Sequence, residues 1–355
     1  MRRRLSFSLS VFLCILFLYS CATSRYTYRE TAYEGAVEKG TVLRGFSIDP
    51  DLEEKILALD PEHITERDIK ETLSHAPAPR IINIHGGIYP VHLAMKSFSK
   101  FLIGMGYPEA KIRNPKDGSY SYSCYESSEK LAGIIAWYYE KEGLQPMVTG
   151  HSQGGIQAVK VLHELAGSFG TNVSVWNPIT EASENRYSIV DPLTGDERPV
   201  IGLQVSYASA VGAGGLTRFL PNQWNMMAKL RTIPNSVEEF TGFYMGLDLF
   251  GGDFIGFGPS NKYEANGTAS VRNVRLPVGY SHVFVPFTEH LAESQEIRDW
   301  INNYVQTDKP ELTVTFLSSS SNILWAADVW HSIKKHWCLE AQRLIRSKRA
   351  MENDH

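Results

Sequence analysis

The sequence predicts an α/β fold in which helices cover both faces of a mostly parallel sheet, and three observations predict it. Between residues 80 and 165, short apolar runs alternate with stretches of helical period. The last of these runs, Pro146-Met147-Val148-Thr149, leads into a Gly-x-Ser-x-Gly sequence that opens another helical stretch. Hydrophobic residues make up 43% of the 355 residues, which is enough for a large core. Alternation of strand and helix builds a parallel sheet, because each helix crosses back over one face of the sheet.

The N-terminal segment is predicted to be a targeting signal outside the fold. Three arginines, Arg2–Arg4, precede an apolar run from Leu5 to Tyr19 that is too short to span a membrane comfortably. The run ends in Leu18-Tyr19-Ser20-Cys21, which resembles the lipobox of bacterial lipoproteins, although Tyr19 departs from the usual small or aliphatic residue. The resemblance implies cleavage before Cys21 and lipidation of Cys21 by acyl chains such as palmitate. An ordinary secretory signal with a chance cysteine is the alternative.

The same resemblance implies a location in the cell envelope, because several acyl chains hold a protein firmly to a bilayer. Ala22 rather than Asp follows the cysteine, which by the bacterial sorting rule implies the outer membrane of a Gram-negative bacterium rather than the inner one. The formal net charge of −4 provides no basic field, so we expect no nucleic-acid partner. Two further cysteines, Cys124 and Cys338, either pair as a disulfide in an exported chain or stay as separate buried thiols.

Composition and turn residues divide the chain into four parts. These are a signal peptide at 1–20, a tether at 21–45, a main domain at 46–310 with an insertion at about 177–198, and a C-terminal strand-and-helix extension at 311–355. In the first half, hydrophobic period and helix-ending glycines define each element. In chain order we expect one or two short helices in 48–75, a Pro-rich break at 76–79, a buried strand at 80–84, a helix around 95–105, a return strand at 107–113, polar turns at 114–126, a helix from about 128 to 142, a strand at 146–149 and a helix through 156–165.

The second half follows the same alternation with longer interruptions. In chain order we expect a short strand at 173–176, a polar insertion at 177–198 that could form a small hairpin, a strand at 199–207, a Gly-rich loop at 212–223, a helix at 224–231, a strand at 240–247, a loop at 251–258, a strand at 271–276, a helix after Ser294, an edge strand at 312–317 and a helix at 323–347. Basic residues near the end of the last helix allow two hypotheses. The helix either touches anionic lipid or packs on the domain with a solvated basic face.

The Gly-x-Ser-x-Gly sequence predicts a nucleophile. A sharp turn from strand to helix leaves little room beside the serine, so Gly150 and Gly154 supply that room and the strained turn holds the Ser152 hydroxyl clear of the sheet. The helix that follows points its first N–H groups at any negative charge that forms there. A serine hydroxyl also needs a base, an acid that orients the base, and hydrogen-bond donors for the oxyanion.

These features resemble the α/β-hydrolases of the lipase and esterase kind, over roughly residues 80 to 305. The resemblance rests on the strand that runs into His85-Gly86-Gly87, on the Gly150–Gly154 elbow, and on an Asp and a His that follow later strands. It implies His282 as the base, because His282 follows the last clear strand and precedes a final helix. It implies Asp248 as the acid, with Asp253 as the alternative, since both spacings suit one intervening loop and strand.

The resemblance further implies that the backbone N–H groups of Gly87 and Gln153 form the oxyanion hole. It implies a packing role for His151, next to the nucleophile. The sequence contains no metal-binding or phosphate-loop motif, so we expect no cofactor and no metal. The loops at 177–198 and 212–225 could cap the site, and aromatic residues in or near them suit either an acyl chain or the core, namely Trp176, Tyr207, Phe219 and Trp224.

The expected activity is hydrolysis of carboxylic esters by Ser-His-Asp nucleophilic catalysis through an acyl-enzyme. The expected partners are a small-molecule or lipid ester substrate and a membrane, the latter through the lipid anchor. Because a fold does not fix a substrate, a thioesterase or a serine peptidase on the same fold stays open. A non-catalytic binding lipoprotein on a hydrolase scaffold is the alternative from another functional class.

Overall fold

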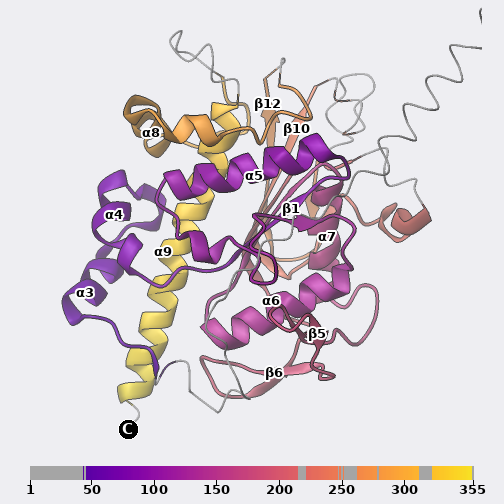
Figure 1. Ribbon diagram of the computed structural model, residues 1–355. Coiled ribbons are helices and arrows are strands. Elements are labelled where there is room, and N and C mark those ends of the chain that lie inside the picture. The colour runs from indigo at the N-terminus through magenta and orange to yellow at the C-terminus, as the bar shows by residue number, and fades with distance from the viewer. Residues whose placement is uncertain are drawn as a thin grey trace, which may run out of the picture.

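The computed structural model describes residues 43, 45–214, 221–246, 248, 251, 262–277, 280–311 and 322–353. It shows an α/β fold around a six-stranded sheet with the order β12-β10-β8-β3-β1-β2 (Figure 1). Each neighbouring pair in this sheet is parallel, as the alternation of strand and helix predicts. The strands are β1 (Ile81–His85), β2 (Tyr122–Ser123), β3 (Met147–His151), β8 (Val205–Val211), β10 (Val237–Met245) and β12 (Ser270–Leu276).

Two apolar cores lie on the two faces of the sheet, because successive side chains of a strand point to opposite faces. In β3, Val148 belongs to the core under α6 and α7, whereas Met147 belongs to the core under α5 and α9. These four helices are α5 (Tyr89–Gly104), α6 (Ser128–Glu142), α7 (Gln153–Leu165) and α9 (Ile323–Asn353). Figure 1 shows α9 passing along one side of the sheet, with α6 and α7 on the other.

Short helices and turns join these layers. Residues 48–75 form the expected short helices, α3 (Pro50–Ala58) and α4 (Glu66–Glu71), with two 3-10 turns, η1 (Pro61–His63) and η2 (Leu73–His75). Capping side chains explain where both helices begin, since Asp49 accepts from the N–H of Asp51 and Thr65 accepts from the N–H of Asp68. Later in the chain come η7 (Glu289–Ala292) and α8 (Gln295–Asn302), the helix expected after Ser294.

The prediction of a return strand at 107–113 is wrong. This stretch contains the 3-10 turn η3 (Glu109–Lys111), and the edge strand is β2, inside the stretch we expected to hold only turns. Tyr107 and Ile112 are buried, but the charged residues between them face outward, so the stretch has too few apolar positions for a strand. The Tyr107 hydroxyl donates to the carbonyl of Pro79, which fixes the turn against the start of β1.

The insertion forms two antiparallel hairpins beside α6 rather than part of the central sheet. They are β4 (Trp176–Asn177) with β5 (Ala182–Ser183), and β6 (Ser188–Val190) with β7 (Glu197–Pro199). Polar contacts hold them there, since the indole of Trp137 donates to Glu184 and Arg186 pairs with Glu140. The expected hairpin in the insertion is thus confirmed. The short strand predicted at 173–176 begins only at Trp176, in β4, and the strand predicted at 199–207 begins only at Val205, in β8, so both predicted starts are wrong.

After β8, the stretch predicted as a helix at 224–231 is a 3-10 helix, η5 (Pro221–Met226), followed by turns and β9 (Thr232–Ile233). Strand β9 pairs with β11 (Glu264–Ala265) in a small parallel sheet of its own. The expected edge strand at 312–317 lies outside the described residues, as do the signal peptide and most of the tether.

Helix α9 packs on the domain along its length. Its apolar stripe is buried, including Trp330 and Trp337, and its C-terminal end lies beside α3 (Figure 1). The Lys334 ammonium donates to the carbonyl of Ile64 at 2.7 Å, and burial lowers its pKa to about 8. Further along the helix, Arg349 pairs with Glu53 at 3.0 Å. Its basic residues thus contact the protein itself, which favours the packed helix over a helix that touches lipid.

The disulfide left open for Cys124 and Cys338 does not form. The two cysteines are separate buried thiols, and they lie in the two cores on opposite faces of the sheet. The sheet between them keeps the sulfur atoms from approaching bonding distance. Within the described part of the chain, no helix is both long enough and apolar enough to cross a membrane.

Candidate active site

Ser152 lies in a strained turn between β3 and α7. Its backbone has φ 58° and ψ −124°, a conformation that side-chain-bearing residues seldom adopt. Close packing explains the flanking glycines. A Cβ at Gly150 would lie 2.3 Å from the carbonyl oxygen of Gly154, and a Cβ at Gly154 would lie 2.1 Å from that of Ile84. The Ser152 N–H donates to the carbonyl of Val211 at 2.9 Å, which ties the turn to the end of β8.

A chain of hydrogen bonds runs from Ser152 through His282 to Asp248. The Ser152 hydroxyl lies 2.8 Å from His282 Nε2, and His282 Nδ1 lies 2.9 Å from Asp248 Oδ2. A carboxylate only accepts, so Nδ1 carries the proton and Nε2 presents its lone pair to the serine. The carboxylate is held in turn, because Asp248 Oδ1 accepts from the backbone N–H of Gly251 at 2.8 Å. Both His282 and Asp248 are buried, with 9% and 8% of their surfaces exposed.

The parallel sheet explains how residues so distant in sequence meet. Ser152 follows β3, Asp248 follows β10 and His282 follows β12, and the carboxyl ends of parallel strands lie at one edge of a sheet. Strands β3 and β12 are separated by β8 and β10, which is about 14 Å at the usual strand spacing. The segments that carry Asp248 and His282 must therefore reach back over the end of β8.

Gly212, directly after β8, makes this approach possible, and sequence reasoning placed it only in a glycine-rich loop. Its φ is +57°, and a Cβ there would lie 2.9 Å from His282 Nδ1 and 3.3 Å from Asp248 Oδ2. The imidazole and the carboxylate thus rest on the surface of a residue that has no side chain. A glycine at the end of a central strand is the sequence feature that could have identified this contact.

Two other histidines border the site. His151 is fully buried, and its Nε2 lies 2.6 Å from the backbone carbonyl oxygen of His282. Burial, helped by the neighbouring His282, lowers the pKa of His151 to about 3. His85 Nδ1 lies 2.8 Å from the carbonyl oxygen of Gly86, and burial lowers the pKa of His85 to about 4. Both rings are therefore neutral at pH 7, and each can donate one hydrogen bond to the main chain.

The two residues expected to form the oxyanion hole lie next to each other beside the serine. A Cβ at Gly87 would lie 2.5 Å from Gln153 Oε1, and a Cβ at Gly86 would lie 2.9 Å from Ser152 Cβ. Gln153 is the first residue of α7, so its N–H belongs to the helix end that has no partner within the helix. The Tyr125 hydroxyl donates to the carbonyl of Gly87 at 3.2 Å and so holds this loop in place.

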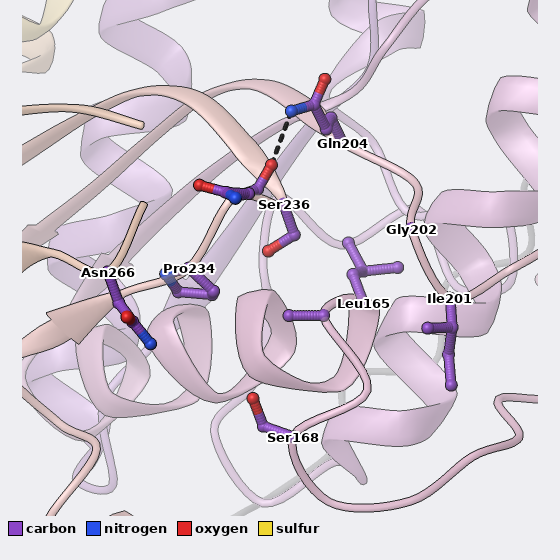
Figure 2. Close-up of a pocket in the computed structure, with 10 residues that line it drawn as sticks. Leu165, Ser168, Ile201, Gly202, Gln204, Pro234, Ser236 and Asn266 are labelled. Atoms are coloured by element: carbon purple, nitrogen blue, oxygen red, sulfur yellow. Dashed lines mark hydrogen bonds between the residues drawn. The ribbon is translucent and has the colours of Figure 1, made fainter. Parts of the chain in front are cut away.

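A hollow of about 430 Å³ lies at the opposite end of the sheet (Figure 2). Gln204 and Ser236, which precede β8 and β10, help to line it, whereas Ser152 follows the other end of β3. None of its lining residues is titratable, although the hydroxyl of Ser168, which lines it, lies 3.0 Å from Nδ1 of His163. Among the described residues, no group of three or more His, Cys, Asp and Glu side chains could hold a metal ion. The alternative acid Asp253 and the expected lipidation site Cys21 lie outside the described residues.

A scan against protein-family models finds no model that matches this chain, and a search of curated proteins finds no match either. The functional argument therefore depends on the geometry around Ser152.

Proposed function

We propose that this protein is a serine hydrolase that cleaves carboxylic esters through an acyl-enzyme on Ser152. The observation that carries the proposal is the hydrogen-bonded chain from Ser152 to His282 to Asp248, built on a strained turn between strand and helix. A buried turn serine with a structural role has no need of an imidazole at 2.8 Å whose other nitrogen is held by a carboxylate. This combination is the nucleophile, base and orienting acid that acyl transfer requires.

In the first step, Ser152 Oγ attacks the ester carbonyl carbon while His282 Nε2 takes the hydroxyl proton. Asp248 stabilises the resulting imidazolium, and the N–H groups of Gly87 and Gln153 donate to the oxyanion. The C–O bond to the alcohol then breaks, and the proton on Nε2 goes to the leaving alkoxide. A water molecule repeats the sequence on the acyl-serine and releases the carboxylic acid. Each oxyanion donor contributes about 100-fold to 1,000-fold in rate.

The α/β-hydrolase fold is part of the proposal. The order of Ser, Asp and His along the chain, each after a strand, is the order that this fold uses. Its oxyanion hole combines the residue after the nucleophile with a loop after an earlier strand, which Gln153 and the loop at Gly87 match. Loops over the mouth of the site would cap it. Of the two loops expected to do so, the hairpins at 177–198 pack along α6, which leaves 212–225 as the candidate, and residues 215–220 of that loop lie outside the described residues.

An apolar ester is the substrate class that the surroundings favour. Three large apolar side chains are about half exposed on the segments that carry the site: Tyr89 at 49%, Tyr125 at 51% and Phe284 at 55%. Tyr89 follows Gly87 by two residues, Phe284 follows His282 by two, and Tyr125 bonds to Gly87. Aromatic surface beside a nucleophile suits an acyl chain or an apolar alcohol, as in a lipid ester, better than a polar peptide.

We also propose that lipid on Cys21 anchors the mature chain in the cell envelope, at the outer membrane of a Gram-negative bacterium. The support is the arginine-led apolar run that ends in Leu18-Tyr19-Ser20-Cys21. Cys21→Ser should move the protein from the membrane fraction to the soluble fraction after cell lysis. A variant that stays with the membrane would show that Cys21 does not anchor it.

The proposed activity is tested with nitrophenyl esters of increasing acyl length, using the protein without residues 1–20. Wild-type protein should hydrolyse them with saturation kinetics, and Ser152→Ala should lose at least 1,000-fold in turnover, the scale set by removing a nucleophile. Thioester and peptide substrates in parallel separate an esterase from a thioesterase or a peptidase. Equal rates for the wild type and Ser152→Ala would contradict the proposal.

A further inference from the structure

Among the described residues, the His151 side chain makes one hydrogen bond, and that bond goes to the main chain of the proposed base. Its Nε2 lies 2.6 Å from the carbonyl oxygen of His282, and the two ring centroids lie 5.3 Å apart. A carbonyl oxygen only accepts, so His151 Nε2 carries the proton and donates. His151 Nδ1 is buried and has no partner among the described atoms, as expected for the lone-pair nitrogen of a neutral ring.

The two residues joined by this bond lie in different kinds of structure, one in the central sheet and the other in a turn. His151 is the last residue of β3, in the middle of the sheet, and pairs in register with Val211 of β8. His282 lies in a turn between β12 and η7, outside any helix or strand. The bond therefore ties a turn to the centre of the sheet, 131 residues away in sequence.

The contacts of the His282 ring cannot hold its main chain in place throughout a turnover. The bond to Ser152 changes each time a proton moves between oxygen and Nε2, and the bond to Asp248 strengthens when the ring becomes charged. Bonds that do not depend on the proton on His282 hold this turn instead. Asn322 Nδ2 donates to the carbonyls of Phe284 and Phe287 at 2.7 and 3.0 Å, and at His282 itself the carbonyl accepts from His151 in a bond that does not involve the His282 ring.

We infer that His151 is a positioning residue that fixes the main chain of His282, and through it the imidazole, relative to Ser152 on the same elbow. The inference rests on the proposed function. It adds a task to the residue between Gly150 and Ser152, for which packing alone was expected. Ser152 follows His151 directly. The end of β3 therefore fixes the position of the nucleophile and, through His151, the position of the His282 imidazole.

The electrostatics of His151 suit this task. Burial, then the nearby His282, lowers its pKa to about 3, and the titratable groups that face it are His282 and His85. A neutral ring keeps its Nε2 proton, and hence the bond, throughout the range in which an ester hydrolase works. A charged ring in the same place would oppose the imidazolium that must form on His282.

Two substitutions separate positioning from packing. His151→Gln keeps a donor at the same distance along the side chain, whereas His151→Met keeps the volume and removes the donor. We expect His151→Met to lose about 100-fold in kcat with KM within about threefold, since a misplacement of about 1 Å costs this much. His151→Gln should recover to within about tenfold of the wild type. Its kcat/KM should keep the wild-type pH dependence, because burial lowers the pKa of His151 to about 3, so replacing its imidazole removes no group that titrates in the assay range.

Thermal unfolding and labelling by a fluorophosphonate distinguish the failures. Equal losses in both variants, or a loss in His151→Met that follows a matching loss of stability, would mean that His151 only packs. Wild-type kcat in His151→Met would also overturn the inference. In each of these cases the wild type still labels and Ser152→Ala does not, so the proposed function stands. A wild-type protein that neither labels nor hydrolyses esters would instead remove the proposed function, and the inference with it.

Discussion

Replacing Asp248 by Asn should prevent His282 from acting as a base while the protein still folds. The reason is the way in which the two carboxylate oxygens of Asp248 are bound. Oδ1 accepts from the N–H of Gly251 at 2.8 Å, and Oδ2 accepts from His282 Nδ1 at 2.9 Å. In Asp248→Asn, the amide oxygen can satisfy only one of these donors. If it turns to His282, the amide N–H₂ faces the Gly251 N–H, and leaving a buried donor without a partner costs about 1–3 kcal/mol.

The amide oxygen should therefore stay on Gly251, so that its N–H₂ group faces His282 Nδ1. The imidazole then has to carry its proton on Nε2, where it faces Ser152 and cannot accept the hydroxyl proton. The loss of turnover for this wrong tautomer is about 10,000-fold, or about 5 kcal/mol of transition-state stabilisation. The assay is steady-state hydrolysis of a nitrophenyl ester, with circular dichroism and thermal unfolding to confirm the fold.

The matched control is Asp253→Asn, which changes the alternative acid in the same way. It should keep turnover within about threefold of the wild type, because Asp248 already binds His282 Nδ1. The reasoning is refuted if Asp248→Asn stays within tenfold of the wild type while Asp253→Asn loses several orders of magnitude. That result would assign the acid to Asp253 and give Asp248 a role in the turn.

Three further predictions concern Gly212, Glu340 and the two described cysteines. Gly212→Ala should lose at least about 100-fold in kcat in the ester assay, because its Cβ would lie 2.9 Å from His282 Nδ1. The control is Gly202→Ala, which is also at positive φ, but its Cβ would lie 4.0 Å from the nearest atom. This variant should keep wild-type kcat. Burial raises the pKa of Glu340 from 4.5 to about 7, so the folded protein holds that proton to higher pH than the unfolded chain does, and the free energy of unfolding should fall as pH rises from about 4.5 to about 7. Urea unfolding at pH 5 and pH 8 should show this fall reduced by about 3 kcal/mol in Glu340→Gln, and an unchanged fall would contradict it. A thiol reagent should titrate the two described cysteines only after unfolding, without prior reduction, and a requirement for reductant would indicate a disulfide.

The sequence predicts the central sheet well because its strands follow simple rules. Strands β1 and β3 lie in short, largely apolar stretches bounded by turn residues, and every residue in them is buried, as expected of strands covered on both faces. A strand is missed where the element is too short to show a pattern in the sequence. Strand β2 has two residues within a polar stretch, and its pairing with β1 depends on the neighbouring helices rather than on its own composition.

The candidate site was accessible from the sequence to the extent that it follows from the topology. Ser152 is marked by its elbow, and the structure brings it together with Asp248 and His282, both of which were selected because they follow strands. The bond from His151 to His282 was not accessible, and the approach of the imidazole to Gly212 was indicated only by a glycine near the end of a strand. Each depends on how far a turn reaches back over β8, which a single sequence does not encode locally.

In the proposed mechanism His282 makes the Ser152 hydroxyl a nucleophile, and the rate at which a serine-reactive probe labels Ser152 reports this step. The protein without residues 1–20 is incubated with a fluorophosphonate, digested, and mapped by mass spectrometry, with His282→Ala in parallel. We expect one adduct, on the peptide that contains Ser152, and a labelling rate at least about 1,000-fold lower in His282→Ala. An adduct on another residue, or labelling of Ser152 at the same rate without His282, would contradict this mechanism.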